Sequence, residues 1–363
     1  MKKLLVFILT NLILVSCASA ASNSQLIQSR LMSNNGVPPS NSAPLPKSSL
    51  PNFEHIVLIM LENRDYPNVI GSGQMPLLNT LATSNILLSN YFAVAHPSLP
   101  NYLALMSGGT QAVTSDSPNY FVNQPNLADE IEASGRTWKS YLEGLPSPCF
   151  MGDSGKYAQK HNPLLYFDSV RLNTARCDRS IVPLTSLDVD LAKKQLPNFS
   201  FIMPDLCNSG HDCSAGVADK WVNDMISKLQ ASPALGNNSL IIIAFDEAGD
   251  KSTLGCCGLS SPAGGQVAVV LISPSALTDF TDNTPYSHYS LLKTILVAWN
   301  LPALGHTADA STQPIVAPWT GQLGPVTSIN QGAPTASHPL AAQRSSTGTQ
   351  PPALPAMTGR ITP

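Results

Sequence analysis

The chain has 363 residues, a formal net charge of −3 at pH 7, and charged side chains at only 12% of its positions. A weakly acidic chain with so few charges offers no basic surface of the kind that binds nucleic acid, so we expect no nucleic-acid partner. The length suits one large domain or two ordinary ones, and 43% of the residues are hydrophobic, enough for a sizeable core.

The N-terminus has the pattern of a secretory signal over residues 1–20. Lys2 and Lys3 precede an apolar stretch over 4–15, and the small residues at 18–20 form a cleavage site. The apolar stretch is too short for a membrane span. The residues before Cys17 also resemble a bacterial lipoprotein box, which makes a lipid anchor there the alternative. Both interpretations place the mature protein outside the cytoplasm, as a secreted or periplasmic protein or one anchored to the cell envelope.

Two stretches of biased composition flank the middle of the chain. Residues 21–52 are rich in Ser, Asn and Pro, and we expect a disordered leader there. Residues 306–363 are dominated by Pro, Ala, Ser, Thr and Gly without periodicity, and we expect a low-complexity, disordered tail. The folded domain is therefore expected over 53–305.

Between these stretches, apolar runs of strand length alternate with segments of helical period. This alternation predicts an α/β fold with a mostly parallel sheet, and the continuous apolar runs suit strands buried on both faces. Residues 144–180 have little periodicity and are expected to form a long insertion. In chain order, strands are expected over His55–Leu61, Ile86–Phe92, Trp138–Leu142, Phe199–Met203, Ser239–Phe245 and Gln266–Ile272, and helices over Met75–Thr83, Asn126–Ser134, Ala215–Gln230 and Tyr289–Trp299.

Six cysteines remain once Cys17 is assigned to the signal. An even number of cysteines in an exported protein suggests disulfides, and six cysteines allow 15 pairings among which the sequence does not choose. The pairing we expect is Cys149–Cys177, Cys207–Cys213 and the neighbouring Cys256–Cys257. A zinc cluster is disfavoured because the chain has no pair of CxxC motifs.

A proline-bracketed turn, His96-Pro97-Ser98-Leu99-Pro100, carries a serine immediately before a segment of helical spacing. Pro100 is tolerated in the first helical turn, so Ser98 is expected at the N-terminal end of a helix. Free backbone N–H groups and the helix dipole favour an anion at that place. Taken alone, such a serine is most often a plain N-cap. The interpretation as a functional serine depends on the other polar groups that reach it.

Polar clusters follow three of the expected strands: Glu62-Asn63, Asp205 with His211, and Asp246-Glu247. In open α/β sheets, ligands bind outside the carboxyl ends of the strands, so these clusters are expected to meet at one edge of the sheet. Each cluster alone is more often a turn or a helix cap. Together their carboxylate and amide oxygens suit a divalent cation.

A divalent cation beside Ser98 would lower the pKa of its hydroxyl and make it a nucleophile. The helix N-terminus would stabilise charge on a transferred phosphoryl group. His96, His211 and His288 are candidates to bind phosphate oxygens or to protonate a leaving group. These residue types fit phosphoryl transfer, which depends mainly on positioning and charge stabilisation.

Four motifs stand in order along the chain: Phe53–Arg64, His96–Tyr102, Phe245–Glu247 and Ser287–Thr294. Together they resemble the secreted bacterial and fungal acid phosphatases and phospholipases C, a family within the alkaline phosphatase superfamily. The resemblance covers roughly residues 53–300 and implies a three-layer sandwich of helices around a mostly parallel central sheet. It also implies a metal held by Glu62, Asn63, Ser98, Asp246 and Glu247, with Ser98 as the nucleophile. Asp205, His211 and Asp212 match the family's motifs less closely.

The sequence thus predicts a secreted, metal-dependent phosphomonoesterase of the acid phosphatase type, acting on a small phosphate ester through a phosphoserine intermediate. The chain's length favours an acid phosphatase over the longer phospholipases C, but a phosphodiesterase or phospholipase C on the same fold is the alternative. A non-catalytic exported binding protein is the alternative from another class. A serine esterase is disfavoured because Ser98 lacks the GxSxG nucleophile elbow. Contact with a membrane is expected only through an anchor at Cys17.

Overall fold

A nine-stranded sheet forms the centre of the molecule in the computed structural model, which describes residues 49–249, 251–324 and 329–330. Eight strands follow one another across the sheet, and β9 (Phe280–Asp282) pairs with β2 off that path. Across the sheet the order is β10 (Tyr286–Ser287), β2 (Ile86–Phe92), β8 (Gln266–Ile272), β6 (Ser239–Phe245), β1 (His55–Leu61), β5 (Phe199–Met203), β3 (Trp138–Leu142) and β4 (Ile181–Pro183).

The sheet is mostly parallel, and its one reversed strand is β8. β8 pairs antiparallel with both β6 and β2, so β2 runs in the same direction as β6. The remaining neighbours pair in parallel, with Leu61 opposite Phe245 at the ends of β1 and β6. The carboxyl ends of β1, β2, β5 and β6 therefore lie at one edge of the sheet, where ligands bind in open α/β folds.

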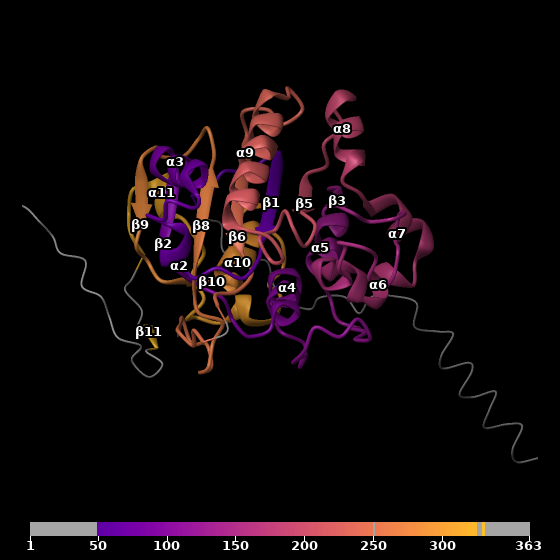
Figure 1. The fold of residues 1–363 in the computed structure, drawn as a ribbon, viewed down its shortest axis with the longest axis horizontal. Coiled ribbons are helices and arrows are strands. Elements are labelled where there is room, and N and C mark those ends of the chain that lie inside the picture. The colour runs from indigo at the N-terminus through magenta and orange to yellow at the C-terminus, as the bar shows by residue number, and fades with distance from the viewer. Residues whose placement is uncertain (1–48, 250, 325–328, 331–363) are drawn as a thin grey trace, which may run out of the picture. The chain divides into compact units, whose positions relative to one another are not determined.

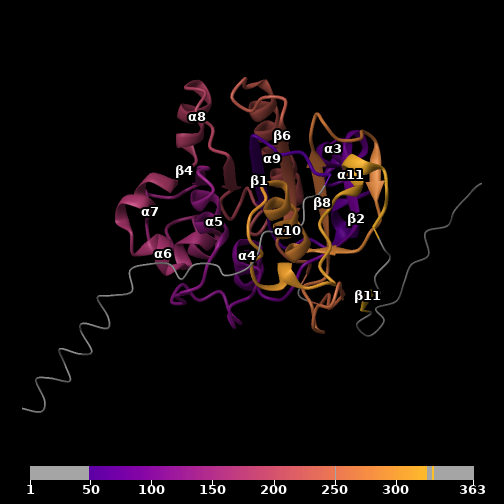
Figure 2. The same ribbon diagram turned by 180° about the vertical axis from the view of Figure 1, so that it is seen from behind.

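Helices cover both faces of this sheet. The helix α9 (Ala215–Ala231) lies on the face turned to the viewer in Figure 1, and α10 (His288–Ala298) lies on the opposite face, seen in Figure 2. The helix α3 (Pro76–Ser84) packs against α9, and α4 (Ser98–Ser107) packs against α10. This is the expected three-layer sandwich. Other elements are α2 (Tyr66–Val69), α5 (Leu127–Ala133), α8 (Thr185–Ala192) and a ribbon of β7 (Gly255–Cys256) with β11 (Ile329–Asn330).

The six strands predicted from apolar runs are all present with the expected bounds. Every residue of β6 is buried, as is all of β1 except its first residue, because helices cover both faces. The four helices expected from periodicity are present, with ends shifted by at most one residue. We did not anticipate the short strands β4, β9 and β10, which have two or three residues each and show no alternation.

The expected insertion over 144–180 folds into short helices rather than an irregular loop. Its central apolar residues, at 164–167, are fully buried. Helices of three to seven residues are too short to show a period in the sequence. The segment contains η1 (Gln159–His161), η2 (Pro163–Tyr166), α6 (Asp168–Arg171) and α7 (Thr174–Ser180).

The expectation of disorder from residue 306 onward is wrong for 306–324. These residues include most of η3 (Gly305–Ala308) and all of α11 (Ala317–Thr320), and Thr307, Ile315 and Ala317 are fully buried. The backbone N–H of Ile315 donates to the Thr294 hydroxyl at 2.8 Å, which ties the segment to α10. A few apolar residues are enough to pack a short segment against the rest of the domain, even where they show no helical or strand periodicity.

The N-terminal assignment needs a similar correction over 49–52. Leu50 is buried, and the Asn52 carbonyl accepts a hydrogen bond from Asn238 at 2.9 Å, so these residues belong to the domain. The expected signal peptide, Cys17, most of the leader and residues 331–363 lie outside the described residues.

The six cysteines other than Cys17 form disulfides. The pairs are Cys149–Cys177, Cys207–Cys213 and Cys256–Cys257, as expected. Among the described residues, helices are too short or too polar to span a bilayer.

Candidate active site

Ser98 is the first residue of α4 and lies at the carboxyl edge of the sheet. Residues 93–97 lead from the end of β2 to the helix, and the Ser98 side chain is almost completely buried. The helix is capped by another residue, because the Leu99 N–H donates to Asp116 Oδ1 at 2.9 Å. The structure thus rules out the plain N-cap role. The hydroxyl instead lies 2.9 Å from Glu247 Oε1 and 3.3 Å from Glu62 Oε2.

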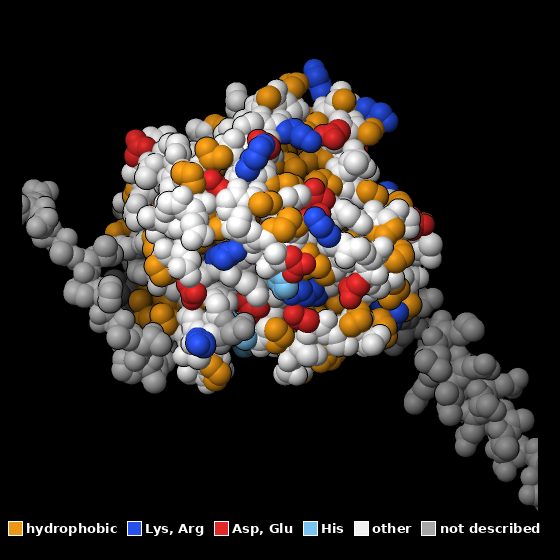
Figure 3. Space-filling view, in the orientation of Figure 1, with side chains coloured by type: hydrophobic (Ala, Val, Ile, Leu, Met, Phe, Trp, Pro, Cys, Tyr) orange, Lys and Arg blue, Asp and Glu red, His pale blue; other side chains and the backbone are white. Residues whose placement is uncertain are grey.

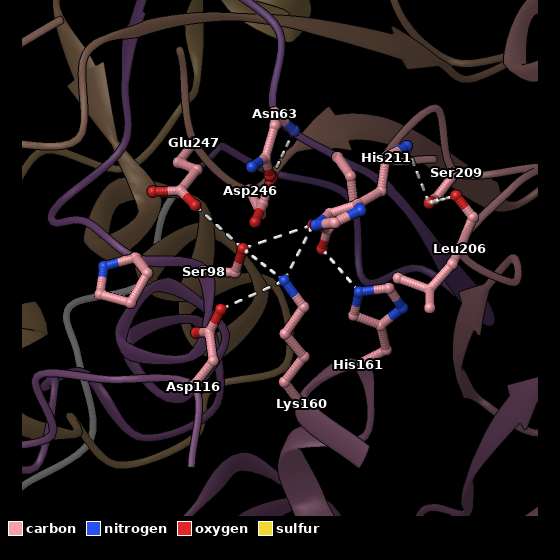
Figure 4. Close-up of polar contacts among 12 residues, drawn as sticks. Asn63, Ser98, Asp116, Lys160, His161, Leu206, Ser209, His211, Asp246 and Glu247 are labelled. Atoms are coloured by element: carbon pink, nitrogen blue, oxygen red, sulfur yellow. Dashed lines mark hydrogen bonds and ion pairs between the residues drawn. The ribbon is translucent and has the colours of Figure 1, made fainter. Parts of the chain in front are cut away.

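Three carboxylates that follow two neighbouring strands lie close together at this edge of the sheet, and two of them contact the Ser98 hydroxyl. Glu62 follows β1, and Asp246 and Glu247 follow β6; all three are at most 2% exposed. The pairing of Leu61 with Phe245 brings Glu62 next to Asp246. Asn63 joins them, since its N–H donates to Asp246 Oδ1 at 3.0 Å (Figure 4). The structure therefore brings together all five residues expected to hold a metal.

Two residues that sequence analysis did not assign complete the cluster. Lys160 reaches in from η1, with its Nζ 3.1 Å from Ser98 Oγ, 3.2 Å from Asp116 Oδ2 and 3.5 Å from Glu62 Oε2 (Figure 4). His161 Nε2 lies 3.0 Å from Glu62 Oε1. No pattern in the sequence indicated that Lys160 and His161 approach Ser98 and Glu62. The insertion has no hydrophobic periodicity, and it is far along the chain from the ends of β1 and β6.

Tyr102, which belongs to the motif at 96–102 and to the expected helix, is a third residue of the cluster without a predicted role. It lies one turn after Ser98 on α4, and its hydroxyl donates to Glu62 Oε1. The sequence did indicate that Tyr102 lies near Ser98, because positions i and i+4 share one face of a helix. A tyrosine one turn beyond a candidate nucleophile was a recognisable site candidate.

The structure separates the three histidines predicted to act on phosphate. His96 Nδ1 lies 2.5 Å from Glu247 Oε2, and its Nε2 donates to the Ser252 carbonyl at 2.7 Å. Since Nε2 must carry a hydrogen to reach a carbonyl, a proton lies between Nδ1 and the carboxylate. His96 therefore orients Glu247 through a charge-assisted hydrogen bond.

His288 lies behind the site rather than in it. It is fully buried, with Nε2 2.6 Å from the Asp246 carbonyl and Nδ1 3.0 Å from the Tyr91 hydroxyl. Burial lowers the pKa of His288 to about 4, although the bond to the Asp246 carbonyl opposes this. The neutral ring donates through Nε2 and accepts from Tyr91. His288 is placed to position the backbone of Asp246, and no described contact takes it to Ser98.

His211 is the histidine that remains accessible. It lies in the loop after β5, which the Cys207–Cys213 disulfide closes, and its side chain is 34% exposed. Its Nδ1 lies 2.7 Å from Asp212 Oδ1, and Figure 4 shows the side chain directed toward the cluster. Asp205 has a local role instead, because its Oδ1 accepts the N–H groups of Cys207 and Asn208 at 2.9 and 2.8 Å.

The three carboxylates differ in their electrostatic environment. Burial opposes ionisation of Glu62, but His161, Lys160 and Tyr102 outweigh it and hold its pKa well below the usual range. Burial raises the pKa of Asp246 strongly, and the charges of Glu62 and Glu247 add to this. Burial also raises the pKa of Glu247, against the lowering effect of His96. Two of the three carboxylates thus carry a repulsion that a further cation would relieve.

Two buried oxygens show that the residues fit a divalent cation. Within the described part of the chain, Asn63 Oδ1 and Asp246 Oδ2 have no hydrogen-bond partner. Hard oxygens of carboxylate, amide and hydroxyl groups suit such a cation. The described residues hold no three His, Cys, Asp or Glu side chains already in metal-site geometry. Glu62 and Glu247 are engaged with Lys160, His161 and His96, so binding a cation would require them to redirect an oxygen.

Known proteins are similar to this chain in sequence, and others are similar to it in fold. Residues 72–302 match the Phosphoesterase family. An acid phosphatase from Aspergillus fumigatus is 35% identical over 281 residues, covering 75% of this chain and 60% of that protein. A phosphatidylinositol-3-phosphatase from Mycobacterium tuberculosis is 32% identical over 268 residues, covering 73% of this chain and 83% of that protein.

The solved structures with a similar fold are distant in sequence. A member of the alkaline phosphatase superfamily from Vibrio parahaemolyticus superposes with a TM-score of 0.50 at 11% identity, covering 77% of this chain and 75% of that one. A lipoteichoic acid synthase, LtaP, from Listeria monocytogenes superposes with a TM-score of 0.51 at 11% identity, covering 75% of this chain and 80% of that one. The chain spans about three-fifths of the acid phosphatases that it matches. The resemblance inferred from the four motifs is confirmed, and the chain belongs to the Phosphoesterase family.

Proposed function

We propose that this protein is a secreted, divalent-metal-dependent phosphomonoesterase of the acid phosphatase type, acting through a phosphoserine intermediate. The observation that carries the proposal is the position of the Ser98 hydroxyl. It is buried at a helix N-terminus between two glutamates, with a lysine ammonium 3.1 Å away. A hydroxyl with these contacts is positioned to act as a nucleophile rather than to cap the helix.

Formation of the phosphoserine uses groups that contact Ser98. The hydroxyl proton passes to Glu247, whose Oε1 is the nearest acceptor at 2.9 Å. A divalent cation held by Glu62, Asn63, Ser98, Asp246 and Glu247 would lower the pKa of the hydroxyl and neutralise phosphoryl charge. The positive end of the α4 dipole stabilises the same charge, although the Leu99 N–H is engaged by Asp116 and Pro100 has no N–H. His96 keeps Glu247 oriented throughout.

His211 is the group best placed to protonate the leaving alcohol. It is accessible and paired with Asp212, whereas both ring nitrogens of His96 and His288 are engaged with protein atoms. After the alcohol departs, the same imidazole accepts a proton from the water that attacks phosphoserine, as a general acid must do in reverse. His211 thus serves both halves of the reaction.

The proposed location outside the cytoplasm has two supports. Three disulfides persist in oxidising compartments, and the N-terminal sequence has the pattern of an export signal. A lipid anchor at Cys17 is the alternative to free secretion. The substrate is a small phosphate ester, and no nucleic acid is proposed as a partner.

A substrate panel with and without chelator tests this proposal. We expect the mature protein to hydrolyse p-nitrophenyl phosphate, to lose that activity in EDTA, and to regain it on addition of a divalent metal. Hydrolysis of bis-p-nitrophenyl phosphate or p-nitrophenylphosphorylcholine at a higher rate would support the phosphodiesterase alternative. Absence of turnover on all esters and all added metals would leave only a binding protein.

A further inference from the structure

Lys160 carries an inference that deepens the proposed function and rests on it. Its ammonium is buried among acidic groups, with the side chain only 11% exposed. A buried ammonium is costly to desolvate, and replacing a whole buried ion pair by apolar side chains commonly leaves a protein as stable as before. The position of this charge beside a nucleophile therefore calls for a reason beyond stability.

The position of Lys160 relative to Ser98 is fixed by Asp116. One carboxylate oxygen of Asp116 accepts the Leu99 N–H at 2.9 Å, at the start of the helix that carries Ser98. The other oxygen accepts from Lys160 Nζ at 3.2 Å. One residue thus anchors the ammonium to the helix start, and Lys160 cannot move far without breaking that link.

The ammonium has three hydrogens, and its partners account for all three. They point to Ser98 Oγ, Asp116 Oδ2 and Glu62 Oε2. When Ser98 Oγ bonds to phosphorus, the nonbridging phosphoryl oxygens lie next to that atom. The hydrogen that pointed at the hydroxyl is then within reach of one of these oxygens, which carries charge and is the stronger acceptor.

We propose that Lys160 is a catalytic residue whose ammonium binds a nonbridging oxygen of the phosphoryl group during its transfer to Ser98, and so favours dianionic monoesters over diesters. A monoester presents more negative charge and one more nonbridging oxygen than a diester. A fixed cation therefore stabilises its transfer more. Figure 3 shows basic, acidic and histidine side chains gathered at the level of α4, where such a substrate would enter.

The chemical step balances without a further reactant. The bond from Ser98 Oγ to phosphorus forms as the bond from phosphorus to the alcohol oxygen breaks. The serine proton goes to Glu247, and the alcohol oxygen takes a proton from His211. Lys160 keeps all its protons and supplies only charge and one hydrogen bond.

The test compares Lys160→Gln with a matched control, Lys139→Gln. Lys139 is also a partly buried lysine paired with an aspartate, Asp190, at 2.6 Å, but it lies on β3 away from Ser98. In Lys160→Gln we expect kcat/KM for p-nitrophenyl phosphate to fall about 100-fold and for the bis-ester less than about 10-fold. The Kd for inorganic phosphate, by calorimetry, should rise roughly 10-fold or more. Lys139→Gln should leave all three values unchanged.

Equal losses for both esters with an unchanged phosphate Kd would overturn the inference and leave Lys160 as a structural counterion. Should Lys160→Gln fail to fold, acetylation of the wild-type protein decides. Saturating phosphate should slow modification of Lys160 by about 5-fold or more and leave Lys139 unaffected, because a bound anion occupies the ammonium. Unchanged labelling of Lys160 would contradict the inference. A wild type that hydrolyses no monoester would instead contradict the proposed function itself.

Discussion

Two regions build the candidate site, and they differ in how they do it. The strand ends after β1 and β6 supply Glu62, Asn63, Asp246 and Glu247 from the most regular part of the molecule. The insertion over 144–180 supplies Lys160 and His161 from a short 3₁₀ turn. The strand ends provide carboxylate and amide oxygens, whereas the insertion provides positive charge through Lys160. We infer that the strand ends supply the groups that the reaction requires, and that the insertion adjusts their charge and so the rate.

Among the changes that compare these two regions, the largest effect should follow from one at the strand ends. Asp246→Asn keeps the shape of the side chain but removes one charge from the proposed metal site, so kcat/KM should fall about 1,000-fold or more. Metal content after dialysis, measured by elemental analysis, should fall in parallel, with partial rescue at high metal concentration.

Asp219→Asn is the matched control for Asp246→Asn. Asp219 is another buried aspartate that accepts backbone N–H groups, from Leu77 at 3.0 Å and Leu78 at 2.7 Å, at the start of α3. Its replacement should lower the thermal midpoint and leave kcat/KM within about 2-fold of wild type. Comparable losses of activity in both variants would mean that Asp246 acts through folding alone.

The insertion should depend on its disulfide more than the loop after β5 depends on its own. Cys149 and Cys177 are separated by 28 positions, whereas Cys207 and Cys213 are separated by 6. Loop-closure entropy predicts a loss of about 3–4 kcal/mol for the double Cys→Ser variant of the first pair and about 2 kcal/mol for the second.

Urea unfolding of the two double variants measures this difference. The order should hold even where the absolute values shift, because the longer loop gains more freedom when it is released. A larger loss for the pair at 207 and 213 would show that the insertion is held mainly by its buried apolar residues.

The smallest effect should come from His161, within the insertion. His161→Gln keeps a donor toward Glu62 but removes the ring, so the pKa of Glu62 should rise and kcat/KM should fall about 10- to 100-fold. His55→Gln is the control, since the His55 ring bonds through Nδ1 to the Pro197 carbonyl at 3.0 Å, and His55 lies at the opposite end of β1 from Glu62.

An unchanged kcat/KM in His161→Gln would show that His161 does not affect catalysis through Glu62. A loss as large as that of Asp246→Asn would erase the distinction between a region that sets the chemistry and one that tunes it.

The sequence was informative where the structure is periodic. Strands such as β1 and β6 are buried on both faces, so their residues are apolar without interruption and their ends are marked by the first polar residue. That first polar residue is also where ligands bind in this fold class. The fold and the candidate metal-binding residues could therefore be predicted from the same pattern.

The sequence was uninformative where contacts are made by short or irregular segments. Lys160 reaches Ser98 across 62 positions from a three-residue turn, and nothing local to either residue encodes that approach. The same limit explains the error over 306–324, where Ile315 is buried by tertiary contact alone. His288 shows a different limit, because a helix start predicts its place on the chain but not the direction of its ring.

Identification of the phosphorylated residue tests the central claim most directly. Wild-type protein is mixed briefly with a ³²P-labelled monoester and quenched in acid, and the labelled peptide is sequenced by mass spectrometry; Ser98→Ala is treated in parallel. We predict phosphate on Ser98 in the wild type, and in the variant no label and a kcat reduced about 10,000-fold, because no other described nucleophile contacts Glu247 and Lys160 together. Label on another residue, or a variant that retains a tenth of the activity, would contradict the account.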